Sequence, residues 1–255
     1  MKSIKEIAEE IKKCSYKDFQ IMKENLVNDT RKGVIKEVEK REKYFIKLQK
    51  EINEYKNRQR YEIELFKKGY SLIAGLDEVG RGPLAGPVCA AAVILDPKSS
   101  YLGVKDSKKL SEKQREELSI KIKETALSYC IAYATPQEID EINILNATKL
   151  AMKRAIEGLN IKPDYLLLDA INVNVNIPQK SIIKGDDNSI SIGAASIIAK
   201  VERDNYMKEI SKKYPFYDFE NNKGYGTDSH IKGLKEHGPC EIHRKSFIKS
   251  ILGEN

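Results

Sequence analysis

Three short apolar runs that each lead into an acid constrain the fold of this 255-residue chain more than any other feature. The run LIAGLD ends at Asp77, YLLLD ends at Asp169, and SIIKGD reaches Asp186 after a Lys-Gly pair. Short apolar runs bounded by polar residues are typical of buried strands. Ligands gather beyond strand ends in α/β sheets, so we expect these acids, together with Glu78, to face a common point.

The segments between these runs predict the remaining layers of the fold. Further strands are expected at residues 88–95 and 129–134, and helices at residues 111–126, 144–159 and 190–214. Strands that alternate with helices indicate an α/β fold, in which helical layers flank a central sheet. We therefore expect residues 71–255 to form one α/β domain that ends in a helical C-terminal region.

Residues 1–70 differ from the rest, because their pattern is helical and basic. Ser3 and Glu6 form a capping-box pattern, and apolar residues at helical spacing follow it. A break at residues 28–33 separates this segment from a longer helical stretch, which predicts a helical hairpin or short bundle. The 70 residues hold 19 Lys and Arg against 13 Asp and Glu, out of a chain net charge of +7. We expect an accessory extension whose bases help to hold a phosphate backbone; the alternative is a solvated appendage without chemistry.

The composition narrows the class of protein. No apolar run approaches the roughly 18 residues of a membrane span, and the N-terminal MKSIKEIAEEIKK lacks the apolar core of a signal peptide. We therefore expect a soluble cytoplasmic protein without a membrane partner. The isoelectric point of about 9.0 favours an anionic partner such as nucleic acid. The four cysteines form no C-x-x-C pair, which indicates free thiols.

The segment HGPCEIH places three possible zinc ligands close together, namely His237, Cys240 and His243. A structural zinc site needs four such ligands. Because no fourth ligand lies nearby in the sequence, we favour structural roles for these three residues over zinc binding.

Four carboxylates that converge would repel one another and would be costly to bury without a partner. A divalent cation resolves this conflict, and oxygen-only ligands suit Mg²⁺ or Mn²⁺. Pairs of such cations held by carboxylates hydrolyse phosphodiesters. Each acid alone is weak evidence, because an acid after a strand is usually a turn or cap residue, as we expect for Asp187.

The Gly80-Arg81-Gly82 segment directly follows Asp77 and Glu78. Glycines leave backbone N–H groups accessible, and Arg supplies a planar donor for phosphate. The alternative is a glycine turn that carries a surface arginine. The residues alone do not separate these two interpretations.

Taken together, these stretches resemble bacterial ribonuclease HII, the type 2 ribonuclease H. The resemblance covers residues 71–248 in order and rests on these segments: GLDEVGRGPLAGPV, KDSKKLSEKQRE, EIDEINILNATKLAM, YLLLDA, IIKGD, SIGAASIIAKVERD, KGYGT and HRKSF. It implies a ribonuclease H-like fold, with a central mixed sheet flanked by helices. Ribonuclease HIII is less similar, since it typically carries Lys where Arg81 stands and has a sheet-containing N-terminal domain.

The resemblance also implies an activity. It implies metal-dependent cleavage of RNA in RNA–DNA hybrids, with two Mn²⁺ or Mg²⁺ ions. It further implies incision 5′ to single ribonucleotides embedded in duplex DNA, which leaves 3′-hydroxyl and 5′-phosphate ends and serves ribonucleotide removal and RNA primer processing. We expect a monomer, and the sequence indicates no protein partner.

Position by position, the catalytic and metal-binding acids fall on Asp77, Glu78, Asp169 and Asp186. The ribose-sensing glycine motif falls on Gly80, Arg81 and Gly82, and the substrate-sensing tyrosine falls on Tyr225. Lys108 and Lys109 are candidate phosphate contacts or a solvated helix start. Two departures stand out: the extension itself, since many members start near Leu72, and Ala170, where many members carry Gly.

Two other functions stay open from the residues. An integrase- or resolvase-type nuclease would share the acidic cluster but not the Gly80–Gly82 and Tyr225 combination. A catalytically silent binder of RNA–DNA junctions should have lost at least one acid, whereas all four are present.

Overall fold

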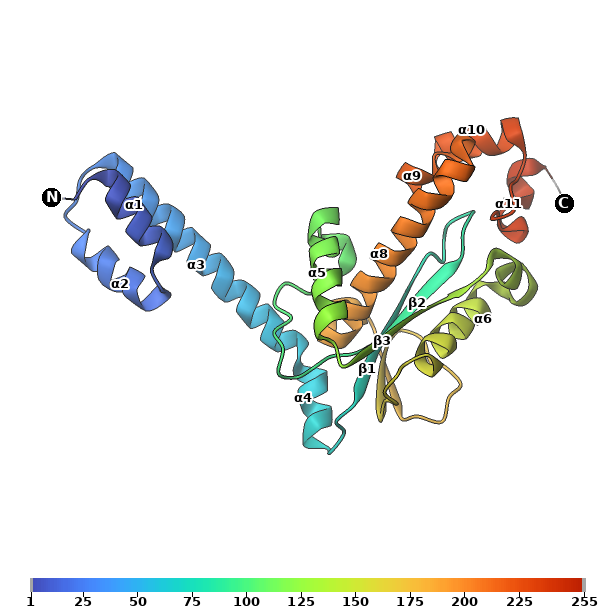
Figure 1. The fold of residues 1–255 in the computed structure, drawn as a ribbon, viewed down its shortest axis with the longest axis horizontal. Helices are drawn as coiled ribbons and strands as arrows, with labels where there is room; N and C mark the ends of the chain where they lie inside the picture. The colour runs from blue at the N-terminus through green and yellow to red at the C-terminus, as the bar shows by residue number, and fades with distance from the viewer. Residues whose placement is uncertain (1, 254–255) are drawn as a thin grey trace. The chain divides into compact units, whose positions relative to one another are not determined.

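The computed structural model describes residues 2–253, which divide into two compact units between Lys56 and Asn57 (Figure 1). The division falls earlier than the expected boundary at residue 70. The physical reason is that the last helix before residue 70 packs on the sheet, as shown below. Each unit has its own hydrophobic core.

The helical unit is built from three helices, which are α1 (Ile4–Lys13), α2 (Tyr16–Asn25) and most of α3 (Lys32–Arg58). The predicted capping box is present, since Ser3 and Glu6 cap the first turn of α1 reciprocally. A second helix start at the N-cap Ser15 was not predicted. The core of the unit is small and wholly apolar, and its buried members are Ile7, Ile11, Phe19, Val34 and Phe45. The expectation of a short helical bundle is confirmed.

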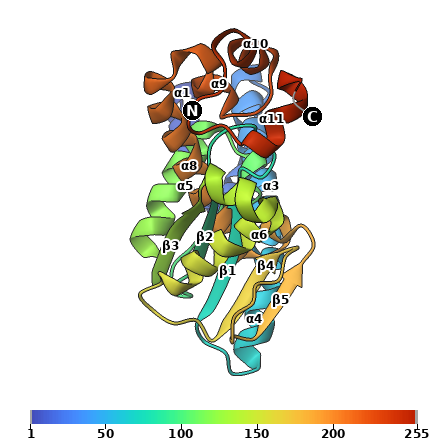
Figure 2. The same cartoon turned by 90° about the vertical axis from the view of Figure 1, so that its right-hand side faces the viewer.

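The second unit contains a mixed five-stranded sheet with the strand order β3-β2-β1-β4-β5 (Figure 2). The strands are β1 (Ile73–Val79), β2 (Val88–Ile94), β3 (Ser128–Ala134), β4 (Tyr165–Asp169) and β5 (Gln179–Ile182). β1 runs antiparallel to β2 and parallel to β4, while β5 continues the parallel half. The predicted α/β fold with a central mixed sheet is therefore confirmed.

β1 is longer than predicted. Its pairing with β2 continues to Val79, which lies opposite Cys89. Asp77 and Glu78 consequently lie inside the strand and not beyond its end. This fixes the backbone of both acids within the ladder of the sheet.

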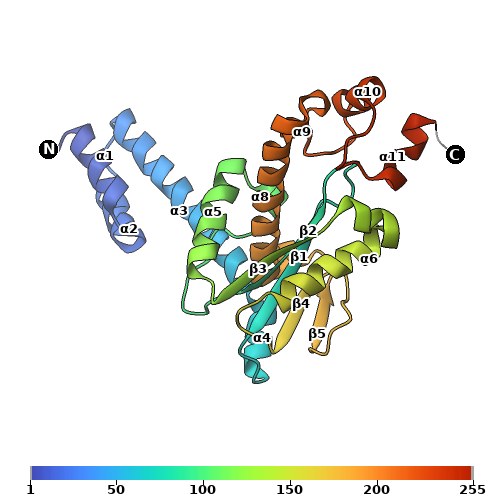
Figure 3. The ribbon, with the colours of Figure 1, turned by 45° about the vertical axis from the view of Figure 1, so that its right-hand side comes forward.

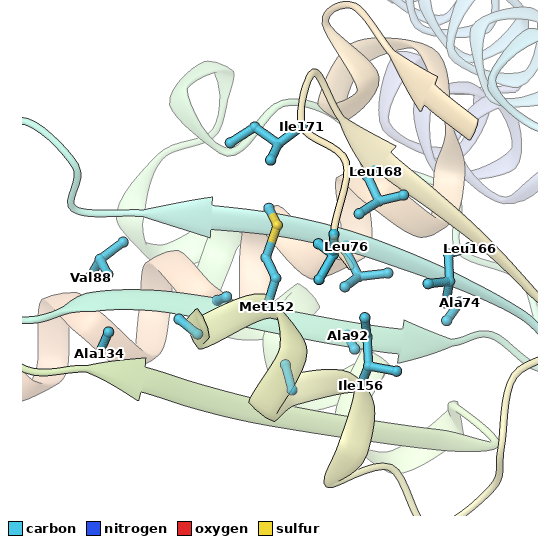
Figure 4. Packing of buried hydrophobic residues seen from close by; sticks show 14 of the residues in the cluster. Ala74, Leu76, Val88, Ala92, Ala134, Met152, Ile156, Leu166, Leu168 and Ile171 are labelled. Atoms are coloured by element: carbon cyan, nitrogen blue, oxygen red, sulfur yellow. The ribbon is translucent and has the colours of Figure 1, made fainter. Parts of the chain in front are cut away.

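Helices cover both faces of the sheet (Figure 3). α6 (Pro136–Glu157) covers one face, and α8 (Ile190–Lys213) covers the other, with α5 (Glu112–Thr125) packed on α8. The α6 face holds the main core, where Met152 and Ile156 meet Leu76 and Leu168 (Figure 4). α6 starts earlier than the predicted helix at residue 144, because Thr135 caps it and a kink at Asn143 joins two helical segments.

The remaining helix of residues 1–70, α4 (Arg60–Lys67), belongs to the sheet unit. Leu65 on α4 packs with Ile73, Leu167 and Ile192, which lie on the α8 side of the sheet. This contact explains why the compact unit begins before residue 70.

The last part of the chain is helical, as expected. It contains α7 (Gly185–Asn188), α9 (Phe219–Asn222), α10 (Asp228–His237) and α11 (Lys245–Leu252). Short 3₁₀ turns lie at Ser107–Lys109 and Pro215–Tyr217. Within residues 2–253, no helix combines the length and apolarity needed to cross a membrane.

Candidate active site

The parallel pairing of β1 and β4 brings the first two acids together. Leu76 lies opposite Leu168, so the next step of the same register places Asp77 beside Asp169. Neighbouring strands lie about 4.8 Å apart. Alternation along β1 turns Asp77 to the same face as Gly75, toward α8. A Cβ at Gly75 would lie only 2.1 Å from the backbone carbon of Ser191, so glycine lets α8 pack directly on β1.

Asp77 and Glu78 are held in an environment that disfavours their charge. Asp77 is 6% exposed, and burial raises its pKa well above the ordinary value; the charges of Glu78 and Asp169 raise it further. Burial also raises the pKa of Glu78, against the opposing effect of Arg81, whose Nη1 lies 3.3 Å from Glu78 Oε1. The other carboxylate oxygen, Glu78 Oε2, is buried and has no hydrogen-bond partner among residues 2–253.

Asp186 reaches the same edge from α7 and not from the end of a strand. The Gly185 N–H donates to Asp169 Oδ1 at 2.7 Å, which ties α7 to β4. Asp186 is 9% exposed, and burial raises its pKa to about 6, with further contributions from the charges of Asp106 and Asp169. The structure therefore brings all four predicted acids into one electrostatically coupled group.

The donor set fits a hard divalent cation in kind and in charge. All four side chains are carboxylates, three have raised pKa values, and Glu78 has an unpartnered buried oxygen. No group of three His, Cys, Asp or Glu side chains between residues 2 and 253 is placed to hold a metal ion without adjustment. For these four carboxylates to hold a cation, their side chains would have to adjust.

The Gly80–Gly82 segment leaves β1 beside these acids. Gly80 has a φ of +89°, and a Cβ there would lie 2.1 Å from Nε of Arg203, so this position requires glycine. Arg81 and Gly82 are exposed, and their N–H groups donate no hydrogen bond within residues 2–253. Tyr225 is 44% exposed, and its Cε1 would lie 3.6 Å from a Cβ at Gly82. The predicted glycine motif and tyrosine are thus neighbours.

Lys108 and Lys109 lie on the 3₁₀ turn Ser107–Lys109, and both are exposed. The Lys109 ammonium forms an ion pair with Asp187, and the charge of Lys108 acts on Asp186. Asp106, at the start of the same turn, also acts on Asp186 and was not predicted as part of the group. Asp106 is the first residue of the DSKK segment, in which only the two lysines were considered as site residues.

Ala170 directly follows Asp169 and has a φ of +51°. This left-handed conformation is costly for a residue with a Cβ and natural for glycine. Glycine would therefore adopt the conformation of residue 170 with less strain than alanine does.

Only two of the three residues of the possible zinc site come together, since Cys240 Sγ lies 3.1 Å from His243 Nδ1 while His237 lies apart. His237 stacks on Phe216, while His243 Nε2 lies 3.0 Å from His230 Nε2 and Cys240 N–H donates to His243 Nδ1 at 2.9 Å. Burial lowers the pKa of both His230 and His243, as expected for neutral packed imidazoles. All four cysteines are free thiols. The preference for structural roles is therefore consistent with these contacts.

Two protein-family models match the chain. The model described as Ribonuclease HII matches residues 74–250, and the model described as Ribonuclease HII N-terminal domain matches residues 3–66. The extension, which the resemblance treated as a departure, is therefore itself a recognised part of some ribonuclease HII proteins.

Several similar proteins are named ribonuclease HII. A ribonuclease HII from Staphylococcus epidermidis is 46% identical over 253 residues, which cover 98% of both chains. One from Caldicellulosiruptor bescii is 56% identical over 195 residues, which cover 75% of this chain and 95% of that protein. Among solved structures, the ribonuclease H2 of Pyrococcus horikoshii OT3 matches with a TM-score of 0.62 at 28% identity, covering 72% of this chain and 98% of that one.

Proposed function

The chain belongs to the ribonuclease HII family and is a ribonuclease H that cleaves RNA in RNA–DNA hybrids; from this premise we propose a finer activity. We infer that it also incises duplex DNA 5′ to a single embedded ribonucleotide and leaves 3′-hydroxyl and 5′-phosphate ends. This activity would serve the removal of ribonucleotides from DNA and the processing of RNA primers.

One observation carries the proposal: four buried or half-buried carboxylates adjoin a glycine loop whose N–H groups at residues 81 and 82 have no acceptor between residues 2 and 253. Asp77, Glu78, Asp169 and Asp186 would hold two divalent cations, Mn²⁺ or Mg²⁺. When bound, such cations supply an activated water and stabilise the leaving oxygen of a phosphodiester. The unpartnered Glu78 Oε2 supports this assignment, because a buried carboxylate oxygen without a donor gains most from a cation.

The chain's own residues around this group would select and orient the ribonucleotide. Free N–H groups of Arg81 and Gly82 can reach a ribose 2′-hydroxyl, which distinguishes RNA from DNA, without an intervening side chain. The exposed ring of Tyr225 beside Gly82 offers a surface for the neighbouring deoxyribose. Such a site reads an RNA-to-DNA junction by sugar shape, largely independent of the base.

Basic residues near the site would hold the phosphate backbone. Lys108 and Lys109 stand exposed next to Asp186 and Asp187, where phosphates could replace the carboxylate of Asp187 as the partner of Lys109. The helical unit would add a weaker and sequence-independent contact, since its surface carries many lysines and arginines.

The test uses three duplexes with the same sequence: all DNA, DNA with one ribonucleotide, and an RNA–DNA hybrid. Each is incubated with the purified chain and Mn²⁺, with Mg²⁺, or with a chelator, and the ends are mapped. We expect a single nick 5′ to the lone ribonucleotide, cleavage of the hybrid, and neither reaction in chelator.

Two outcomes would overturn the proposal. Incision of the all-DNA duplex, with the lone ribonucleotide ignored, would favour an integrase- or resolvase-type nuclease. Tight binding of the junction without cation-dependent incision would favour a silent binder.

A further inference from the structure

Two arginines, Arg203 on α8 and Arg244 before α11, are fully buried beneath the Gly80–Gly82 loop. Neither forms an ion pair with any residue between 2 and 253. A buried guanidinium without a carboxylate is costly unless its donors are otherwise satisfied. The identity of those acceptors therefore indicates what the two charges hold in place.

Every hydrogen bond of the two guanidinium groups goes to a backbone carbonyl. Arg244 donates from Nε to Gly86 O at 2.9 Å, from Nη1 to Arg81 O at 2.8 Å, and from Nη2 to Gly80 O. Arg203 donates to Pro87 O at 3.0 Å, to Ala85 O at 3.2 Å and to Lys223 O at 2.9 Å. Five of these six carbonyls belong to residues 80–87, and the sixth precedes the loop that carries Tyr225.

Peptide geometry converts these contacts into an orientation. The C=O of residue 80 and the N–H of residue 81 belong to one planar trans peptide and point in opposite directions. The same holds for the C=O of residue 81 and the N–H of residue 82. Because Arg244 binds both carbonyls from the buried side, both N–H groups must point away from it. This agrees with the absence of any acceptor for them between residues 2 and 253.

We propose that Arg244, supported by Arg203, is a positioning residue that presents the N–H groups of Arg81 and Gly82 to the ribose. The proposal rests on the function proposed above and adds the residues that set its sugar specificity. The planar fork of arginine holds two adjacent carbonyls in fixed directions, whereas the three donors of a lysine ammonium rotate on a flexible stem. The glycine at position 80 leaves room for the supporting side chain of Arg203.

The experiment compares R244K with R154K in the full chain, on the duplex with one ribonucleotide. Arg154 is the control, since it also donates to a backbone carbonyl, Tyr133 O at 2.8 Å, but it is exposed, pairs with Glu138 and lies on α6. We expect R244K to lower kcat/KM about 100-fold, because a displaced positioning group costs this much. R154K should stay close to the wild type.

A second variant separates positioning from simple loss of structure. R244A should recover cleavage when guanidinium ions are added at low concentration, and methylammonium ions should give no recovery. A third readout needs no variant: hydrogen exchange at the Arg81 and Gly82 amides of the wild type should slow on binding a ribonucleotide-containing duplex and not an all-DNA duplex.

Two results would overturn the proposal: R244K cleaving like R154K, or equal amide protection by both duplexes. A wild-type chain that cuts no ribonucleotide-containing duplex would instead defeat the proposed function. The two failures are therefore distinguishable.

An independent observation concerns Glu62 on α4, which is 6% exposed. Its Oε1 accepts hydrogen bonds from Ser189 Oγ at 2.5 Å, Ser191 Oγ at 2.6 Å and Ser191 N at 3.1 Å. Two neighbours of Glu62 reach the same segment, since Arg58 donates to Asp187 O at 3.1 Å and Arg60 donates to Asn188 Oδ1 at 2.7 Å. The α7 segment that carries Asp186 is thus held by the end of α3 and by α4 at Asp187, Asn188 and Ser189.

We infer that Glu62 is a positioning residue for Asp186, and this inference also rests on the proposed function. The test compares E62A with E64A, because Glu64 lies on the same helix but is exposed and pairs with Lys68. In the metal-free protein, E62A should speed hydrogen exchange at residues 185–189, and its apparent affinity for Mn²⁺, measured by calorimetry, should fall about tenfold. E62Q keeps an acceptor oxygen and should restore most of both quantities. Behaviour of E62A equal to that of E64A in both measurements would overturn the inference, whereas a failure to cleave by the wild type would not.

Discussion

The two compact units of this chain differ most in what they bury. Every buried side chain between residues 2 and 56 of the helical unit is apolar. The sheet unit buries both acids and bases, which include Glu62, Asp77, Asp186, Arg203 and Arg244. Burying charge costs stability, so a chain retains it only where a ligand, a reaction or a required backbone geometry compensates. We therefore expect the reaction to take place in the sheet unit and the helical unit to contribute only the charges on its surface.

The largest expected effect comes from removing one buried acid. D77N should lower cleavage of the single-ribonucleotide duplex at least about 1,000-fold, because a cation ligand is lost. The same variant should raise the melting temperature of the metal-free protein, since asparagine has no charge to bury. E39Q, an exposed acid of the helical unit, is the control and should change neither quantity. Wild-type rates in D77N would remove Asp77 from the site.

Tyr225 should show the next largest effect. Y225A should lower kcat/KM at a single ribonucleotide about tenfold or more, because burying an aromatic ring against the neighbouring deoxyribose contributes about 1.5–3 kcal/mol. Y225F retains the ring and should behave like the wild type. An unchanged preference for the RNA-to-DNA junction in Y225A would refute the sensing role.

Deletion of residues 1–56 tests the helical unit directly. We expect binding to weaken about tenfold and its salt dependence to become shallower, since fewer phosphates are neutralised. The single-turnover rate at saturation should not change, because α4 and all four acids remain. The 195 matched residues make up 95% of the ribonuclease HII from Caldicellulosiruptor bescii. That protein therefore supports the expectation that the sheet unit folds without the helical unit. A loss of the saturated rate would contradict this division of roles.

The pH dependence of cation binding gives a smaller effect. Because the folded-state pKa of Asp186 is raised to about 6 from 3.8, its proton is held more tightly in the folded chain, and its charge destabilises the metal-free fold as the pH rises through this range. Mn²⁺ should therefore raise the melting temperature by a few degrees at about pH 7.5 and by much less at about pH 5.

The effect of Asp186 is isolated by subtracting the melting temperature without Mn²⁺ from the melting temperature with Mn²⁺ at each pH. The lowered pKa values of His230 and His243 act in the opposite direction, since their stabilisation is lost as the pH falls below about 6.5. That contribution does not depend on the cation and cancels. An equal Mn²⁺ shift at both pH values would contradict the assignment of Asp186.

The smallest effect concerns the backbone next to Asp169. A170G should stabilise the chain by about 0.5–1 kcal/mol, because glycine relieves the left-handed strain by more than it costs in unfolded-state entropy. A126G, where the backbone is in the ordinary extended region, should destabilise it. Thermal or urea unfolding measures both, and a destabilised A170G would show that no strain is present.

Some of the site could be predicted because it depends on local patterns. Apolar runs mark β1 and β4, and parallel pairing of such strands brings Asp77 next to Asp169. The proximity of Gly82 and Tyr225 could be predicted only from the resemblance to a known family. No local pattern connects residues that lie so far apart in the sequence.

Other parts could not be predicted, and the reasons are physical. Asp186 was predicted as a site residue, but its position on a helix was not, because α7 has four residues and is too short to leave a periodic signal. Arg203 and Arg244 look like surface bases in the sequence, because five of their six carbonyl acceptors are more than 100 residues away. The unit boundary differs from residue 70 for a similar reason, since Glu62 and Leu65 find their partners in distant segments.

The most direct test of the account is to locate the cations. Crystals of the chain with a ribonucleotide-containing duplex and Mn²⁺, measured at the manganese absorption edge, would show bound ions by anomalous scattering. We predict peaks among the carboxylates of Asp77, Glu78, Asp169 and Asp186, next to the phosphate at the ribonucleotide. Manganese bound elsewhere, with these four carboxylates free of cations, would contradict the central claim.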